Sequence, residues 1–155
     1  MSVLEPYLDY CSSSWYSSIT VSLRNRLDVV QRKMIRFVHG YDSRHHIDSD
    51  HFRDLSWLTM KDRVSYFKMT HLFKIRMGSA PPYLSPGFIS LLDTHAYSTR
   101  GSVSNYRLSK DLALSPSSFV FTAVKLWNQL PNPLKLIDSP GPFKRKLKQH
   151  LLSTY

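Results

Sequence analysis

The chain of 155 residues is 42% hydrophobic, which predicts one domain with a modest core and argues against a disordered tail. Its 21 Lys and Arg against 11 Asp and Glu give a formal net charge of +10, which favours an anionic partner, nucleic acid before an anionic membrane. The one cysteine, Cys11, excludes a disulfide within the chain and a multi-cysteine zinc site, and it is typical of a reducing, intracellular compartment.

Hydropathy argues against two further classes of protein, membrane-spanning and secreted. No run approaches the ~18 apolar residues of a membrane span. No basic segment followed by an apolar run marks a secretory signal. We therefore expect an intracellular chain with no membrane partner. The alternative for the positive charge is a basic surface that binds nothing.

The first 78 residues predict three helices. A short helix is expected around residues 6–10, followed by a turn at residues 12–14. The clearest helix covers residues 23–39 and stops at Gly40. It carries one apolar stripe and a basic remainder, so we expect Leu27 and Phe37 in the core. The stripe consists of Leu23, Leu27, Val30, Met34, Phe37 and Val38.

A polar connection over residues 41–56 leads to a third helix over residues 59–77. Thr59 and Asp62 resemble a capping box at its start. The helix is apolar on much of its circumference, which predicts a central place in the core. One of its faces contains Val64, Phe67, His71 and Ile75.

The second half is punctuated by proline. Residues 78–86 break the chain, residues 93–114 are Ser-rich and irregular, and residues 106–108 are compatible with a brief strand. A fourth helix is capped by Ser117 or Ser118, has Trp127 on its apolar face and ends at Pro131. The last helix covers residues 142–152, with Phe143, Leu147 and Leu151 on one side.

The predicted fold class is therefore mainly α. We expect an irregular array of about four to six helices with long Pro/Ser-rich connections and room for one short strand pair. Residues 1–78 form one helical region. Residues 79–155 form a C-terminal helical extension that packs on it, so that the two make one compact unit.

Side chains suited to chemistry do not assemble into a known site. One polar loop gathers metal-ligand residue types at spacings that match no standard metal site, so we predict a solvated loop. His71 is expected to be a satisfied core histidine, and Cys11 a buried, inert thiol. The loop residues are His45, His46, Asp48, Asp50, His51 and Asp54.

Catalytic motifs are also absent from the sequence. It has no nucleophile elbow, no Gly-rich phosphate loop and no Asp-Asp pair of the kind that holds catalytic metals. We therefore predict no catalytic residue, no metal and no cofactor.

Two basic helices are the positive signal. Residues 23–39 and 142–152 each combine an apolar stripe with an Arg/Lys face, which suits packing on a fold while offering charge to phosphates. An ordinary solvated face is the alternative. A membrane surface ranks low, because the polar faces carry few apolar anchors.

Several short patterns carry a resemblance to a known family. They read Leu-x-Tyr-Cys-Ser-x-x-Trp, Leu-x-x-x-Gln-Arg-x-x-x-Arg-Phe, Thr-Arg-Gly, Phe-x-x-x-Ala-x-x-x-Trp-Asn-x-Leu-Pro and a closing Phe-Lys. In this order and combination the chain resembles the region downstream of the catalytic palm in non-LTR (LINE-type) retrotransposon reverse transcriptases. The matching residues are Leu8, Tyr10, Cys11, Ser12, Trp15, Leu27, Gln31, Arg32, Arg36, Phe37, Thr99, Arg100, Gly101, Phe119, Ala123, Trp127, Asn128, Leu130, Pro131, Phe143 and Lys144.

The resemblance implies a fragment of an RNA-directed DNA polymerase that lacks the palm and its aromatic-x-Asp-Asp motif. It implies a helical thumb that grips a primer–template duplex, RNA–DNA or DNA, through its backbone, in the nucleus or cytoplasm. The family motif covers only Arg32 and Arg36, and the helix faces supply the other assignments. The expected phosphate contacts are Arg24, Arg32, Lys33 and Arg36, then Lys144, Arg145 and Lys148.

Two other functions stay open. A truncated remnant could act as a protein-interaction module, and apolar residues near residues 4–15, uncovered by loss of the palm, predict self-association. An enzyme that uses the His/Asp loop with a metal is the third hypothesis.

Overall fold

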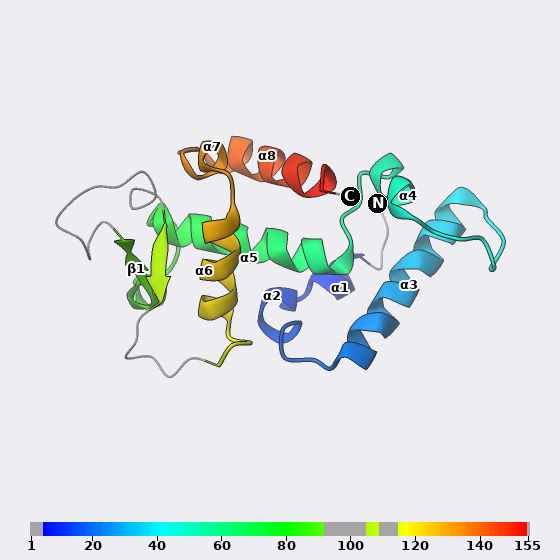
Figure 1. The fold of residues 1–155 in the computed structure, drawn as a ribbon, viewed down its shortest axis with the longest axis horizontal. Helices are drawn as coiled ribbons and strands as arrows, with labels where there is room; N and C mark the ends of the chain where they lie inside the picture. The colour runs from blue at the N-terminus through cyan, green and yellow to red at the C-terminus, as the bar shows by residue number, and fades with distance from the viewer. Residues whose placement is uncertain (1–4, 92–104, 109–114, 155) are drawn as a thin grey trace.

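The computed structural model describes residues 5–91, 105–108 and 115–154. It is mainly helical with one short antiparallel strand pair, which confirms the predicted fold class. Figure 1 shows the elements arranged around the long central helix α5. The elements are α1 (Glu5–Asp9), α2 (Ser12–Trp15), α3 (Val21–His39), α4 (Ser49–Asp54), α5 (Met60–Arg76), η1 (Pro82–Gly87), β1 (Phe88–Ser90), β2 (Tyr106–Leu108), α6 (Phe119–Gln129), α7 (Asn132–Lys135) and α8 (Pro140–Leu152).

Hydroxyl side chains cap three of the four longest described helices; α8 has no side-chain cap. Thr20, Thr59 and Ser118 cap α3, α5 and α6, and each accepts a hydrogen bond from the backbone N–H three residues on. Gly40 ends α3 with φ 67°, a left-handed conformation that glycine adopts without a Cβ clash. The boundaries predicted at Gly40, Thr59 and Ser118 are therefore confirmed, whereas α3 begins at Val21, two residues before its predicted start.

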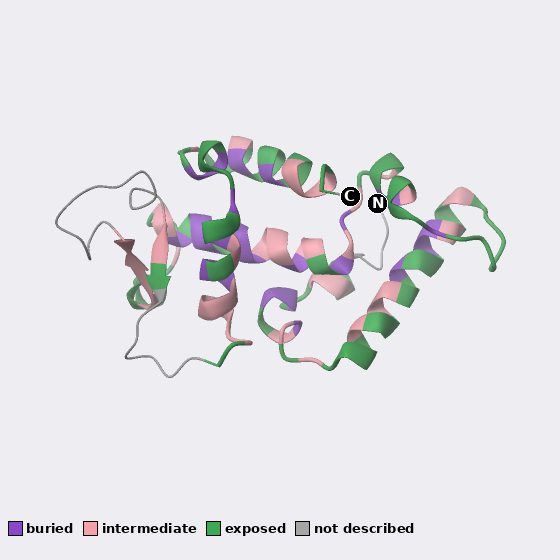
Figure 2. Ribbon diagram, viewed as in Figure 1, coloured by how far each residue is buried: buried purple, intermediate pink, exposed green. Residues whose placement is uncertain are grey.

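The main core surrounds α5. Its Phe73 is buried with Trp127 of α6 and with Phe143 and Leu147 of α8. Trp127 is fully buried, as predicted from the sequence. Because the cluster joins residues from both sides of position 78, the two predicted regions share one core. Figure 2 shows the buried residues concentrated along α5 and the faces turned toward it.

A second cluster joins the N-terminus to the start of α5. Tyr16 packs with Met60 and Val64, and Leu27 of α3 lies partly buried against them. The carboxylate of Asp9 receives two hydrogen bonds from the Arg63 guanidinium, one from Nε and one from Nη2 at 2.7 Å. This paired contact fastens the end of α1 to α5.

The face by which α3 packs differs from the prediction. Gln31, Met34 and Ile35 are its buried residues, whereas Phe37 is 88% exposed. The Gln31 amide donates to the carbonyl oxygen of Leu58 at 2.7 Å, which satisfies a polar group that periodicity assigned to the outside. The predicted core position of Phe37 is therefore wrong. Leu23, Val30 and Val38 of the predicted stripe are exposed as well.

Short elements lie where connections were expected. The polar connection over residues 41–56 contains α4, which buries Phe52 beside Ile47 and Ile35. The predicted turn at residues 12–14 is part of α2, and α7 follows Pro131. Local hydrogen bonds and a few apolar anchors are enough to hold such single turns.

The strand pair confirms the brief strand at residues 106–108. Phe88 pairs with Leu108 and Ser90 with Tyr106. The Asn128 side chain of α6 accepts from the Tyr106 N–H at 3.0 Å and donates to the Tyr106 carbonyl at 2.9 Å. Most of the irregular stretch 93–114, including Thr99, Arg100 and Gly101, lies outside the described residues. Within the described ranges, every helix is too short or too polar to span a bilayer.

Candidate nucleic-acid interface

The basic face of α8, defined as Lys144, Arg145, Lys146 and Lys148, is the more open of the two predicted surfaces. All four side chains are exposed, and in the described chain none of them has a hydrogen-bond or ion-pair partner. The helix contains no Asp or Glu. Its opposite side is held down by the fully buried Phe143 and Leu147. Uncompensated cations on a firmly docked helix suit contact with a polyanion.

Only part of the predicted α3 surface is free. Arg32 and Lys33 are exposed, as is Arg26 on the same helix. The Nε of Arg36 donates to the carbonyl oxygen of His45 at 2.8 Å, which closes the end of α3 onto the following loop. We define the outer basic face of α3 as Arg26, Arg32 and Lys33.

Arg24 faces inward. Its Nη2 donates to the carbonyl oxygen of Ser17 at 3.0 Å, and its guanidinium lies 5.5 Å from the centroid of the Tyr16 ring. Its Nε is buried with no hydrogen-bond partner in the described chain. These contacts turn Arg24 away from the outer basic face of α3 and toward the junction with α5.

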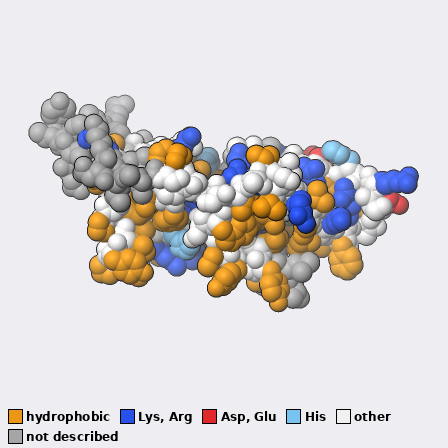
Figure 3. Space-filling view, turned by 90° about the horizontal axis from the view of Figure 1, so that it is seen from below, with side chains coloured by type: hydrophobic (Ala, Val, Ile, Leu, Met, Phe, Trp, Pro, Cys, Tyr) orange, Lys and Arg blue, Asp and Glu red, His pale blue; other side chains and the backbone are white. Residues whose placement is uncertain are grey.

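The structure does not bring the seven predicted phosphate-contact residues onto one surface. In Figure 1, α8 runs above α5, whereas α3 lies beyond the right-hand end of α5. Figure 3, which views the molecule from below, shows blue basic side chains interrupted by orange apolar ones. On α3 itself the apolar residues Leu23, Val29, Val30 and Phe37 are exposed. The α3 side is therefore mixed in character, and the α8 face is basic.

Two buried lysines were missed by sequence reasoning. Lys68 and Lys135 are each only 2% exposed. Lys68 donates to the hydroxyls of Ser17 and Thr122, and burial together with the nearby Arg24 lowers its pKa to about 8. Burial also lowers the pKa of Lys135, which donates to the Asn105 side chain at 2.8 Å. Lysine is so rarely buried that no pattern in the sequence signals either residue.

The His/Asp loop forms a structured helix start. Asp48 caps α4, and its carboxylate contacts the His51 Nδ1 at 2.5 Å. The hydrogen bond with the His51 side chain, together with those from the backbone N–H groups of His51 and Asp50, lowers the pKa of Asp48. Asp50 pairs with Arg53 at 2.8 Å. Among the residues that the structure describes, no three His, Cys, Asp or Glu side chains are grouped to hold a metal.

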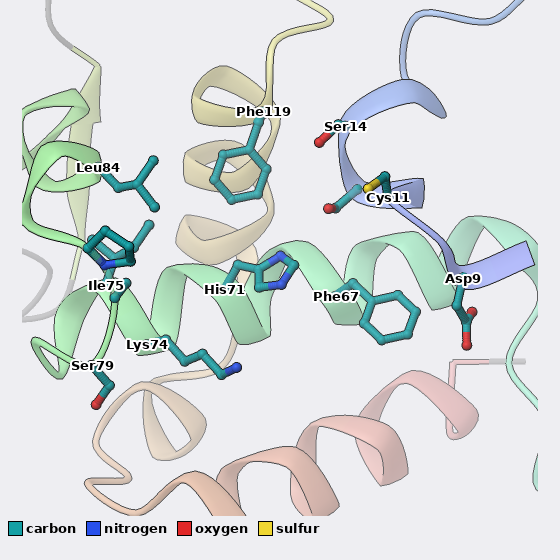
Figure 4. Close-up of a pocket in the computed structure, with 13 residues that line it drawn as sticks. Asp9, Cys11, Ser14, Phe67, His71, Lys74, Ile75, Ser79, Leu84 and Phe119 are labelled. Atoms are coloured by element: carbon teal, nitrogen blue, oxygen red, sulfur yellow. The ribbon is translucent and has the colours of Figure 1, made fainter. Parts of the chain in front are cut away.

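A cavity of about 650 Å³ lies between the N-terminal segment, α5, α6 and η1 (Figure 4). Cys11 and His71 both line it, and both are exposed. The predictions that Cys11 is a buried thiol and that His71 is a core histidine are therefore wrong. Partial burial, and then the charge of Lys74, lower the pKa of His71. No hydrogen bond joins Cys11 to His71 in the described residues, so they do not form a nucleophile–base pair.

Comparison of the chain with family models, curated proteins and solved structures finds no match. The resemblance to a reverse-transcriptase tail therefore stays a prediction from the residues.

Proposed function

We propose that this chain binds the phosphate backbone of a nucleic-acid duplex, with the basic face of α8 as the principal contact. One observation carries the proposal: Lys144, Arg145, Lys146 and Lys148 are exposed on a helix without an acidic residue, and none of them has a partner among the residues that the structure describes. Binding would release the counterions of each phosphate that these side chains neutralise, so affinity depends on salt and little on base sequence.

The outer basic face of α3 is the secondary contact in this proposal. Arg32 and Lys33 are the predicted residues that are exposed there, and Arg32 interacts electrostatically with Asp28 of the same helix. The resemblance to non-LTR reverse transcriptases gives the binding a context, since a thumb that grips a primer–template duplex contacts its backbone. In that context these 155 residues hold the duplex, and a palm domain would contribute the polymerase chemistry in the nucleus or cytoplasm.

The test compares three triple variants with equal charge change. Lys144→Gln, Arg145→Gln and Lys148→Gln neutralise the α8 face. Arg26→Gln, Arg32→Gln and Lys33→Gln neutralise the α3 face. The control variant changes three exposed cations outside both faces, Arg44→Gln, Lys74→Gln and Arg107→Gln. Fluorescence anisotropy measures binding of each to an RNA–DNA duplex at ~50 mM salt, where phosphate contacts are strong.

We expect the α8 variant to lose the most affinity, the α3 variant less, and the control least. Equal losses for the three variants would mean that net charge alone attracts the duplex, and the proposed interface would be wrong. No binding of the unmodified chain at ~50 mM salt would remove the proposed function as a whole.

Self-association is the second candidate function. It is favoured by apolar side chains that stand in solvent on the N-terminal half, namely Tyr7, Tyr10, Val21 and Phe37 at 76%, 78%, 68% and 88% exposure. Sedimentation equilibrium over a wide concentration range tests it with Phe37→Ser. The matched control is Leu136→Ser, because Leu136 is 60% exposed next to α7. A dimer that both variants preserve, or a monomer throughout, would contradict association through this surface.

A further inference from the structure

A second cavity, of about 610 Å³, has a cationic lining. It lies between the loop after α2, α5 and the start of α6, which Figure 1 shows on the same side of α5. Four cations line it, Arg24, Lys61, Lys68 and Lys125, and among its described lining residues there is no Asp or Glu. We call it the Lys68 cavity. Several positive charges around one space, with no negative charge among them, create a positive potential that attracts an anion.

Lys68 is the cation in this cavity that most lacks a counter-ion. Its side chain is almost fully buried, and its Nζ donates to the Ser17 hydroxyl at 2.5 Å and the Thr122 hydroxyl at 2.7 Å. No carboxylate in the described chain pairs with it. Two neutral hydroxyls replace hydration only in part, so a buried ammonium without a counter-ion costs folding free energy.

Arg24 reaches the same place from α3. Its Nε is buried and has no acceptor in the described residues, although its Nη2 is satisfied by the Ser17 carbonyl. A buried guanidinium N–H without a partner is rare in folded proteins, and each such donor calls for an explanation. An anion in the cavity would supply the missing acceptor.

The hydroxyl groups complete the donor set. The Thr122 hydroxyl donates its hydrogen bond to the Ser118 carbonyl at 2.8 Å and accepts one from Lys68. Ser17 also accepts from Lys68, and its own hydrogen has no acceptor in the described contacts, so it is free to donate. Ser65 and Ser117 line the remaining wall.

We infer that the Lys68 cavity is a binding site for a phosphate group. A tetrahedral dianion offers several strong acceptor oxygens, which match the ammonium of Lys68, the Nε of Arg24 and the Ser17 hydroxyl. Exposed Lys61 and Lys125 sit at the edge and add charge for a second phosphate. The phosphate comes either from a free polyphosphate or from the end of a nucleic-acid strand. The inference does not depend on the α8 face.

The test titrates inorganic pyrophosphate into the full chain by calorimetry at pH 7 and constant ionic strength. The key variant is Lys61→Gln with Lys125→Gln, because both side chains are exposed and their loss leaves the core intact. The matched control is Arg44→Gln with Arg107→Gln, two exposed cations outside the cavity and outside both proposed nucleic-acid faces. We expect saturable binding that weakens about tenfold or more in the key variant and is unchanged in the control.

Lys68→Met adds a direct test of the buried ammonium. We expect it to abolish pyrophosphate binding. If that variant fails to fold, the exposed Lys61/Lys125 pair still decides the question. Absence of pyrophosphate binding to the unmodified chain, or equal weakening in the key variant and the control, would overturn the site.

Short oligonucleotides distinguish the two sources. Tighter binding of a 5′-phosphorylated strand than of its 5′-hydroxyl form, lost in the Lys61/Lys125 variant, would assign the site to a strand end. Equal binding of the two forms, together with tight pyrophosphate binding, would assign it to a free polyphosphate. Loss of duplex binding in the α8 variant leaves either result standing, so the two proposals fail separately.

Discussion

The rings of Phe73 on α5 and Phe143 on α8 stack nearly parallel, with centroids 4.2 Å apart and planes inclined by 14°. Both side chains are buried, and Trp127 closes the stack from α6 with its centroid 5.8 Å from that of Phe143. This contact holds the basic helix α8 against the centre of the molecule. The stability of the chain and the position of its proposed binding face thus depend on the same aromatic pair.

Phe143→Ala should therefore lower the free energy of unfolding by about 3–5 kcal/mol, because it removes a large buried side chain and leaves a cavity. Urea denaturation followed by circular dichroism measures the change. The matched control is Phe37→Ala, whose side chain is 88% exposed, and it should change stability by less than about 0.5 kcal/mol. Equal losses would contradict the packing described for both residues.

The pKa of Lys68 predicts a pH dependence of stability. The folded chain holds this pKa at about 8, below the ordinary value of 10.5 expected after unfolding. Between these values the unfolded chain binds more protons, so stability rises with pH. Relative to Lys68→Met, the unmodified chain should gain stability as pH increases from about 8 toward 10. Parallel stability profiles over this range, measured by urea denaturation, would contradict the buried ammonium.

The salt dependence of duplex binding should identify α8. Each phosphate contact contributes about 0.9 to the slope of log affinity against log salt. Replacing Lys144, Arg145 and Lys148 by Gln should therefore reduce that slope by about 2–3. Anisotropy titrations at several salt concentrations measure it. A lower affinity with an unchanged slope would show that these side chains act through the fold and not on phosphates.

Cys11 should react in the folded protein. Its side chain is exposed, at a residue with φ 48° between α1 and α2. A disulfide reagent that releases a coloured thiolate should modify one thiol per chain without denaturant, and Cys11→Ser should give no signal. If labelling required denaturant, the thiol would be buried, as the sequence alone suggested.

Much of the helical layout could be predicted from the sequence. Thr59 and Ser118 lie directly before apolar-periodic runs, and in the structure both accept the capping hydrogen bonds that such positions favour. Proline and glycine likewise placed the ends of α3 and α6. These signals depend only on residues next to the helix ends, so they hold whatever the tertiary packing is.

The face of α3 could not be predicted because it depends on distant partners. Periodicity treats every apolar residue as core, but the segments that cover α3 fully bury only Gln31, Met34 and Ile35. The inward position of Arg24 has the same origin. The short helix α4 was missed because six residues give no periodic signal. Asp48 before His51, flanked by Ile47 and Phe52, was the available clue.

The candidate binding residues likewise divide into those that a local pattern predicts and those that depend on distant partners. The exposure of Lys144, Arg145 and Lys148 follows from the spacing of Phe143 and Leu147, since opposite faces of one helix are fixed together. Lys68 gave no sign of burial, because its hydroxyl partners Ser17 and Thr122 are 51 and 54 residues away in the chain. A site assembled from side chains far apart in the sequence can be recognised only once the tertiary structure is known.

The two hydrogen bonds between Asn128 and the Tyr106 backbone make one side chain behave as a neighbouring strand. Tyr106 uses both its N–H and its carbonyl on this amide, so at that residue the outer edge of β2 offers nothing to another chain's strand. Aspartate would keep the acceptor and lose the donor, and leucine would lose both. A primary amide at position 128 therefore guards this edge against intermolecular sheet growth, a role quite apart from any contact with phosphate.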